Sequence, residues 1–135
     1  MKPYLLLFIS ILPGLLYAQS TTLNENFEDG DFTANPVWIG DTGEFIILDD
    51  SGNNLLQLND TDASNSSTQL RTASAAAYGG WEFYLQMDFN PSSSNYADVY
   101  LISDQEDLLD DLNGYFVRIG GTADEVSLFR QDGAA

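Results

Sequence analysis

The sequence contains no cysteine and no histidine. Without cysteine no disulfide can staple the fold, so its stability must come from a hydrophobic core. Thiolate nucleophiles and the usual zinc sites are excluded for the same reason, and a Ser-His-Asp triad lacks its imidazole base. The chemistry that remains is that of carboxylates, tyrosines and metals with oxygen ligands, such as calcium.

Positive charge is also scarce. The 135 residues carry four Lys and Arg against 21 Asp and Glu, a formal net charge of −17. The only lysine is Lys2, and the remaining cations are Arg71, Arg118 and Arg130. Binding to nucleic acid needs clustered Lys and Arg, so we expect no nucleic-acid partner. Anionic membrane surfaces are unfavourable partners too. Such acidity is typical of a soluble surface that repels its own copies.

The N-terminus, MKPYLLLFISILPGLLYAQS, holds a long apolar run. A lysine precedes the run, Pro13 and Gly14 interrupt it, and the small Ala18 stands just before Gln19. This is the pattern of a secretory signal peptide, and the run is shorter than the about 20 residues of a membrane span. We therefore expect a signal peptide at residues 1–18 and a secreted or cell-surface protein that does not insert into the membrane after cleavage.

A short polar lead, residues 19–23, is expected to precede one domain, residues 24–135. There the hydrophobic pattern has a period of two, with turn-forming Asn, Asp, Ser and Gly between the runs. Only residues 104–114 are compatible with a helical turn, and NENFEDGDF is a candidate edge strand. Many short strands without helices predict an all-β, antiparallel β-sandwich. The expected strands are residues 44–48, 55–59, 68–73, 80–90, 97–103, 115–120 and 125–131.

The stretch GGWEFYLQMDFN alternates almost perfectly. In a strand, alternate side chains point to opposite faces. One face is predicted to build the core, with Trp81 as an anchor; its members are Trp81, Phe83, Leu85, Met87 and Phe89. The other face carries Glu82, Tyr84, Gln86 and Asp88.

The last residues, EVSLFRQDGAA, predict a strand that enters an Asp-Gly hairpin turn. A strand after that turn would be needed to pair with it. We therefore expect residues 24–135 to be the N-terminal portion of a sandwich that is incomplete at its C-terminus.

Several of these runs resemble a known family. ENFEDGDFTANPVWIGDTGEFII, LLQLN, QLRTAS and the run from WEFYLQMDFNPSSSNYADVYLISD to SLFRQDG are similar to the N-terminal module of large secreted Bacteroidetes surface proteins. The resemblance implies a concanavalin A-like (laminin G-like) jelly roll within a multidomain extracellular protein. This fold hosts lectins, glucanases and adhesion modules alike, so the resemblance alone does not choose a function.

A glycoside hydrolase needs two carboxyl groups roughly 5–9.5 Å apart. Glu82 and Asp88 share a face but stand about 20 Å apart along a strand, at about 3.3 Å per residue. The Glu-x-Asp-x-x-Glu motif that glucanases of the resembled fold carry is also missing from this sequence. We therefore expect no enzyme within these residues; the alternative is a hydrolase whose catalytic residues lie in further sequence.

Calcium is a possible ligand with no defined ligand set. Acidic groups cluster in three turns, but the best match to a calcium loop, DTDASN, has Asn65 at its turn-glycine position and Arg71 at its bidentate-Glu position. Solvated turns explain the clusters better. The carboxylates concerned are Asp49, Asp50, Asp60, Asp62, Asp104, Glu106, Asp107, Asp110 and Asp111.

Glycan binding or adhesion is the first functional hypothesis. A sugar offers apolar CH faces and a hydroxyl rim, which suit an exposed aromatic ring beside amides and carboxylates. The candidate ligand-binding residues are Glu82, Tyr84, Gln86, Tyr100 and Tyr115. A structural role for these rings in cross-strand pairs is the alternative, and it corresponds to a spacer or display module. Arg118 is expected to be a structural partner of a neighbouring carboxylate.

Overall fold

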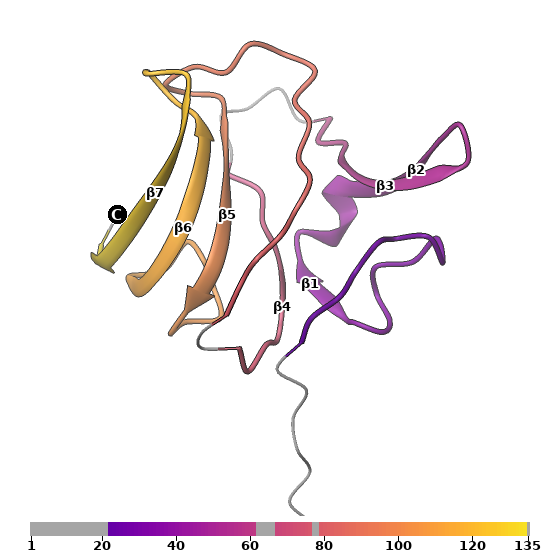
Figure 1. Cartoon of the computed structure of the whole chain (residues 1–135), viewed down its shortest axis with the longest axis horizontal. Coiled ribbons are helices and arrows are strands. Elements are labelled where there is room, and N and C mark those ends of the chain that lie inside the picture. Colours follow the sequence, from indigo (N-terminus) through magenta and orange to yellow (C-terminus); the bar gives the residue numbers. More distant parts are fainter. Residues whose placement is uncertain (1–21, 62–66, 77–78, 135) are drawn as a thin grey trace, which may run out of the picture.

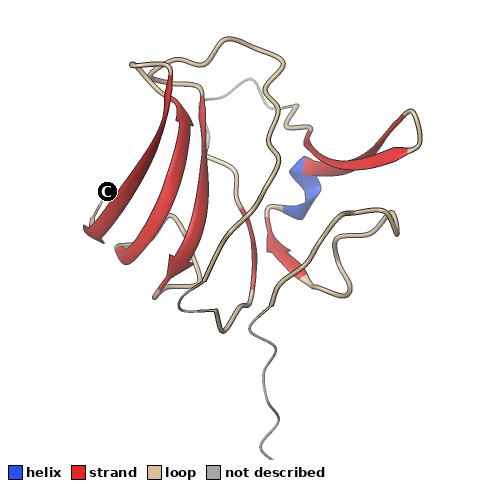
Figure 2. Cartoon of the chain, viewed as in Figure 1, coloured by secondary structure: helices blue, strands red, loops and turns tan. Residues whose placement is uncertain are grey.

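The computed structural model describes residues 22–61, 67–76 and 79–134. The predicted signal peptide and part of the polar lead lie outside these residues. Three antiparallel sheets make up the described part (Figure 1), and its one helical element is the single 3₁₀ turn η1 (Thr42–Glu44). The predicted all-β, antiparallel fold is therefore confirmed (Figure 2). No helix among the described residues is long and apolar enough to cross a membrane.

The largest sheet is a meander of three consecutive strands: β5 (Tyr96–Ser103), β6 (Leu112–Gly120) and β7 (Glu125–Gly133). Val99 of β5 pairs with Val117 of β6, which in turn pairs with Leu128 of β7. A bulge between Tyr100 and Ile102 then shifts the register of β5 by one residue. Bulges re-aim side chains locally, and this one brings Ile102 opposite Tyr115.

One face of this sheet, which we call the aromatic face, carries a row of stacked rings. Phe116 lies between Tyr100, at 4.9 Å between ring centroids, and Phe129, at 5.2 Å. The guanidinium of Arg118 lies 3.9 Å from the centre of the Tyr96 ring, which is the geometry of a cation–π contact. Phe116 and Leu112 are the buried hydrophobic side chains of the described part. The core is thus centred on β6.

Two small two-stranded sheets complete the fold. β1 (Trp38–Gly40) pairs with β4 (Leu70–Thr72), and β2 (Phe45–Asp50) pairs with β3 (Asn53–Leu58). The β2–β3 turn has Ser51 and Gly52 at positive φ, the conformation of the tight turns that suit twisted strands.

Three predicted strands differ from the structure. Residues 80–90, hereafter segment 80–90, form no ladder with any described strand, and NENFEDGDF folds into turns. Local hydrogen bonds compete with pairing there, since Asn26 and Asp31 accept hydrogen bonds from backbone N–H groups two residues further on. β7 continues through Gly133, so the predicted Asp-Gly turn is wrong.

The predicted core face of segment 80–90 is half-buried only at Leu85 and Met87 and is exposed at its other residues. Trp81, Phe83 and Phe89 are 42%, 44% and 56% exposed, because no strand or sheet among the described residues covers them. Residues 104–111 form turns rather than a helix, with one backbone hydrogen bond from Asp110 to Asp107. β1 was not predicted.

Candidate functional site

The predicted site residues lie in two places. Glu82, Tyr84 and Gln86 belong to segment 80–90, whereas Tyr100 and Tyr115 belong to β5 and β6. The structure does not bring the five together into one surface.

Segment 80–90 carries a ladder of polar side chains, as its alternation predicts. The Tyr84 hydroxyl donates to Oε1 of Gln86 at 2.9 Å, and Nε2 of Gln86 donates to Oδ1 of Asp88 at 2.8 Å. Contacts between residues two apart show that these three side chains share one side of an extended backbone. Tyr84 is 77% exposed. The ladder is therefore a wetted surface with an accessible ring.

Tyr100 lies on the aromatic face. Its hydroxyl donates to Oε1 of the buried Gln131 at 2.7 Å, and its ring stacks on Phe116. Burial raises the pKa of Tyr100, and the nearby Asp98 carboxylate raises it further. The hydroxyl is thus engaged in holding the sheet together.

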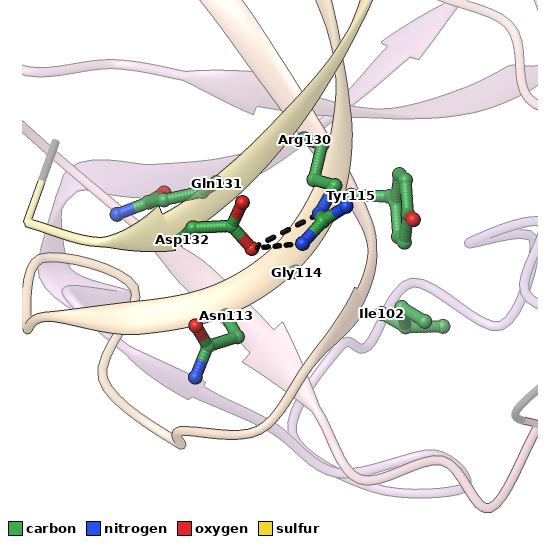
Figure 3. Close-up of a pocket in the computed structure, with 7 residues that line it drawn as sticks. All are labelled: Ile102, Asn113, Gly114, Tyr115, Arg130, Gln131 and Asp132. Carbon is green, nitrogen blue, oxygen red and sulfur yellow. Dashed lines mark hydrogen bonds and ion pairs between the residues drawn. The ribbon is translucent and has the colours of Figure 1, made fainter.

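Tyr115 lies on the opposite face of the same sheet, because β6 turns alternate side chains to opposite sides and Phe116 faces Tyr100. The two candidate tyrosines, Tyr100 and Tyr115, therefore do not share a face of the sheet. The Tyr115 ring is 41% exposed and borders an open hollow of about 440 Å³ (Figure 3). The residues that line this hollow are Ile102, Asn113, Gly114, Tyr115, Arg130, Gln131 and Asp132.

The strand register explains why these residues meet. Tyr115 pairs with Arg130 across β6 and β7, and Asn113 pairs with Asp132 two residues further along. Directly opposed residues point to the same face of a sheet. The bulge in β5 adds Ile102 beside Tyr115. β6 and β7 thus supply an aromatic ring, a guanidinium, a carboxylate and an amide to one surface, and β5 adds the apolar Ile102.

An ion pair dominates the electrostatics of the hollow. Nε and Nη2 of Arg130 donate to Oδ1 of Asp132 at 2.9 and 2.8 Å (Figure 3). These bonds to Asp132 raise the pKa of Arg130 above its ordinary value. Both side chains are about 60% exposed, at 62% and 61%. The pair therefore holds its geometry while its remaining donors and acceptors face solvent.

This arrangement suits the recognition of hydroxyl groups. The guanidinium donates, the carboxylate accepts, and the Asn113 amide does both, while the Tyr115 ring offers an apolar surface. Asp132 is the single carboxylate among the residues lining the hollow. The two-carboxylate chemistry of glycoside hydrolysis therefore has no basis in this hollow.

The acidic turns serve local structure. Asp104 accepts two hydrogen bonds from Asn113, Asp107 accepts one from Gln69, and Asp49 accepts one from the backbone of Gly52. No group of three or more acidic side chains in the described part is arranged to hold a metal ion. Asp62, another of the calcium candidates, lies outside the described residues.

The sequence prediction missed Arg130 and Asp132 as site residues. The sequence held a usable signal, because Arg130 and Asp132 are two residues apart and carry opposite charges, and residues two apart in a strand share a face. That signal was missed because the sequence pattern predicted a turn at Asp132 and Gly133 in place of a continuing strand. The expected structural role of Arg118 is confirmed: its Nε and Nη2 donate to the two oxygens of Asp98, both at 2.7 Å.

In comparisons with known proteins, no family model, no curated protein and no solved structure matches this chain.

Proposed function

We propose that the chain is a secreted, non-catalytic module that binds extracellular glycans through the hollow on β6 and β7. The observation that carries the proposal is the half-exposed Tyr115 ring beside the exposed Arg130–Asp132 ion pair. Sugar rings have apolar CH faces and hydroxyl edges, and this surface offers a partner for each. The signal-like N-terminus and the lack of a second carboxylate in the hollow agree with a secreted binder.

The preorganised ion pair favours neutral sugars. Asp132 already compensates the charge of Arg130, and the whole chain has a formal net charge of −17. An acidic sugar would be repelled by the negative surface, and the charge of Arg130 would not offset this repulsion because Asp132 already compensates it. Neutral oligosaccharides are therefore the ligands to test first.

The test measures binding of laminarihexaose, cellohexaose, xylohexaose and chitohexaose by isothermal titration calorimetry. We expect at least one to bind and Arg130→Ala to weaken it about tenfold or more, because hydrogen bonds to a charged group contribute about 1.5–3 kcal/mol. Tyr115→Ala is expected to weaken binding to a similar degree, through loss of the stacking surface.

Glu125→Ala is the matched control, since it removes a charge from the opposite end of β7. It should leave the affinity unchanged. The proposal fails if no glycan binds to protein whose circular dichroism spectrum shows a folded β structure, or if binding survives both hollow variants. A spacer or display module would then be the better reading.

A further inference from the structure

β7 forms the outer strand of its sheet, with β6 as its one neighbour among the described strands (Figure 1). It is 9 residues long, contains no proline and no lysine, and pairs with β6 without a bulge. Proline, lysine and bulges are the features by which edge strands are usually protected from further pairing. The outer edge of β7 is therefore open to another strand.

The hydrogen bonds of the sheet show which backbone groups of β7 face outwards. The N–H of Asp104 donates to the carbonyl of Asn113, so Asn113 turns its backbone groups towards β5. Backbone groups alternate in direction along a strand, so those of Phe116, three residues further on, turn towards β7. Phe116 pairs with Phe129, which leaves the N–H and C=O groups of the alternate residues of β7 on the open edge. Those residues are Val126, Leu128, Arg130 and Asp132.

The side chains along this edge are largely apolar, and their charges nearly cancel. Val126 and Leu128 are 71% and 67% exposed, and Phe129 is 41% exposed on the aromatic face. Asp132 compensates the charge of Arg130 through their ion pair. On a chain with a formal net charge of −17, this edge is thus a place where two copies can approach with little local repulsion.

The charges of β7 also select a register for self-pairing. Two copies pair antiparallel about a twofold axis only when residues of the same face are opposed. The register that uses the whole strand places its middle residue, Phe129, opposite the Phe129 of the second copy. It sets Leu128 opposite Arg130, and no like charges face each other. Moving the centre by one residue opposes either Arg130 to itself or Asp132 to Asp124, and opposed like charges are destabilising.

We propose that the chain associates with a second copy of itself through β7, which joins two three-stranded sheets into one continuous sheet. The row of rings on the aromatic face ends at Phe129, and Phe116 and Tyr100 stack inwards from it. The N–H of Phe129 turns towards β6, so the two Phe129 residues form a non-hydrogen-bonded pair, in which side chains come closest. The row of rings then runs from one copy into the other, and exposed apolar surface is removed from water.

The second copy also adds to the rim of the hollow, a step that rests on the proposed glycan binding. A twofold axis normal to the sheet keeps the same face of both copies on one side. Leu128 of the second copy then lies opposite Arg130, on the face that carries the hollow. Each hollow thereby gains an apolar side chain at its open β7 side that one copy alone does not supply.

Sedimentation velocity of the unaltered chain tests the association. We expect a monomer–dimer equilibrium with a dissociation constant in the micromolar range, because one pair of strand edges lies at the low end of interface sizes. The dimer should strengthen as sodium chloride rises from about 0.01 M to about 1 M, since salt screens the repulsion between two acidic copies. A chain that stays monomeric at about 1 mM over this whole range would overturn the proposal.

Leu128→Lys is the variant that blocks the edge. It opposes a lysine to Arg130 of the second copy, and we expect the dissociation constant of the dimer to rise about tenfold or more. Leu109→Lys is the matched control, since Leu109 is 62% exposed in the loop between β5 and β6 and the change in net charge is the same. The control lessens repulsion between copies, so its dimer should be unchanged or tighter. Equal weakening by the two variants would contradict an interface at β7.

The lack of cysteine allows the register to be tested by cross-linking. Phe129→Cys sets two thiols opposite each other at about 4.5 Å between Cα atoms, a separation that a disulfide accepts. Ser127→Cys, on the same face, would place its two thiols about 13 Å apart along the strands. We expect air oxidation to give a covalent dimer of the first variant and to leave the second monomeric. Equal cross-linking of the two, or none in a Phe129→Cys chain whose circular dichroism shows a folded β structure, would overturn the register.

The glycan arm is separate. If the hollow binds glycans and the second copy adds to its rim, a saturating hexasaccharide should tighten the dimer about tenfold or more, because a ligand that prefers one state shifts the equilibrium towards it. Glycan binding that leaves the dimer unchanged would refute the shared rim. Absence of any glycan binding would refute the proposed function and leave sedimentation and cross-linking to decide the dimer.

Discussion

At the scale of single residues, Asp104 shows how one carboxylate holds a loop to a strand. Oδ1 accepts the backbone N–H of Asn113 at 2.7 Å, and Oδ2 accepts the side-chain amide of Asn113 at 2.7 Å. The backbone N–H of Asp104 donates in turn to the Asn113 carbonyl at 3.0 Å. Asn113 lines the hollow, so Asp104 fixes a site residue from outside the site.

These bonds make the stability of the loop depend on pH. The side-chain and backbone hydrogen bonds from Asn113 lower the pKa of Asp104 below its ordinary value, which is about 3.9 in an unfolded chain. A group with a lowered pKa in the folded state stabilises the fold above the unfolded value, and this contribution is lost as the pH falls through the folded value. Asp104→Asn should therefore lower the urea midpoint near pH 7 and lose that difference in strong acid.

Urea unfolding followed by circular dichroism across the acidic range measures this effect. Asp110→Asn, an exposed position in the same loop, serves as the control and should leave the midpoint nearly unchanged near pH 7. An Asp104→Asn deficit that stays constant from neutral pH to strong acid would contradict the assignment.

At the scale of elements, the end of β6 depends on a glycine. Gly120 has a φ of +97°, a conformation that L side chains rarely adopt, and a Cβ at this position would overlap the Pro91 ring. Pro91 directly precedes Ser92 of the hydrogen-bonded turn before β5. The glycine thus lets that turn lie against the sheet.

Gly120→Ala should destabilise the fold by about 2 kcal/mol or more, from backbone strain together with the clash. Gly43→Ala is the matched control, because its Cβ would meet open space and its φ is not in the left-handed region. Thermal unfolding should give a lower Tm for the first variant and a nearly unchanged Tm for the second. Equal Tm values for the two variants would contradict this account.

The elements also show what alternation in a sequence determines. Alternation correctly predicted that Tyr84, Gln86 and Asp88 share a side, since this follows from the geometry of one extended chain. It did not determine which strand is paired, or which face of one strand joins which face of the next. The cross-strand register places Tyr100 and Tyr115 on opposite faces of the sheet. A register shift of one residue would move every side chain of a strand to the other face. Register depends on the pairing itself, which a single strand's pattern does not contain.

At the scale of the whole molecule, charge is the dominant property. A formal net charge of −17 on 135 residues produces repulsion within the folded chain, and the described part contains three ion pairs between side chains. Self-repulsion favours expanded states over compact ones. The pairs that remain, such as Arg118 with Asp98, are partly buried and therefore less screened by salt.

Sodium chloride should therefore stabilise the fold. Raising its concentration from about 0.01 M to about 1 M shortens the Debye length from about 30 Å to about 3 Å and suppresses repulsion between distant carboxylates. We expect the Tm in differential scanning calorimetry to rise steadily over this range. A Tm that falls with salt would instead show that the few ion pairs outweigh the repulsion.

The all-β class follows from composition and period alone, whereas the hollow does not. It depends on Arg130 and Asp132 of β7 lying opposite Tyr115 and Asn113 of β6. Those residues are separated along the chain by a turn whose length sets the register. Residues 121–124 form that turn between the paired Gly120 and Glu125, with Gly121 and Asp124 at positive φ, and its exact span is what a sequence pattern leaves open.

The order β5-β6-β7 has a consequence for how the chain reaches its native state. Each of these strands pairs with its immediate successor, so the ladders form by closing short loops, and contacts close in sequence form fastest. β1 and β4, by contrast, can meet only after the whole β2–β3 region has been brought back, a closure with a greater entropic cost. The surface that carries the hollow should therefore be among the first parts of the protein to fold, before β1 and β4 have paired.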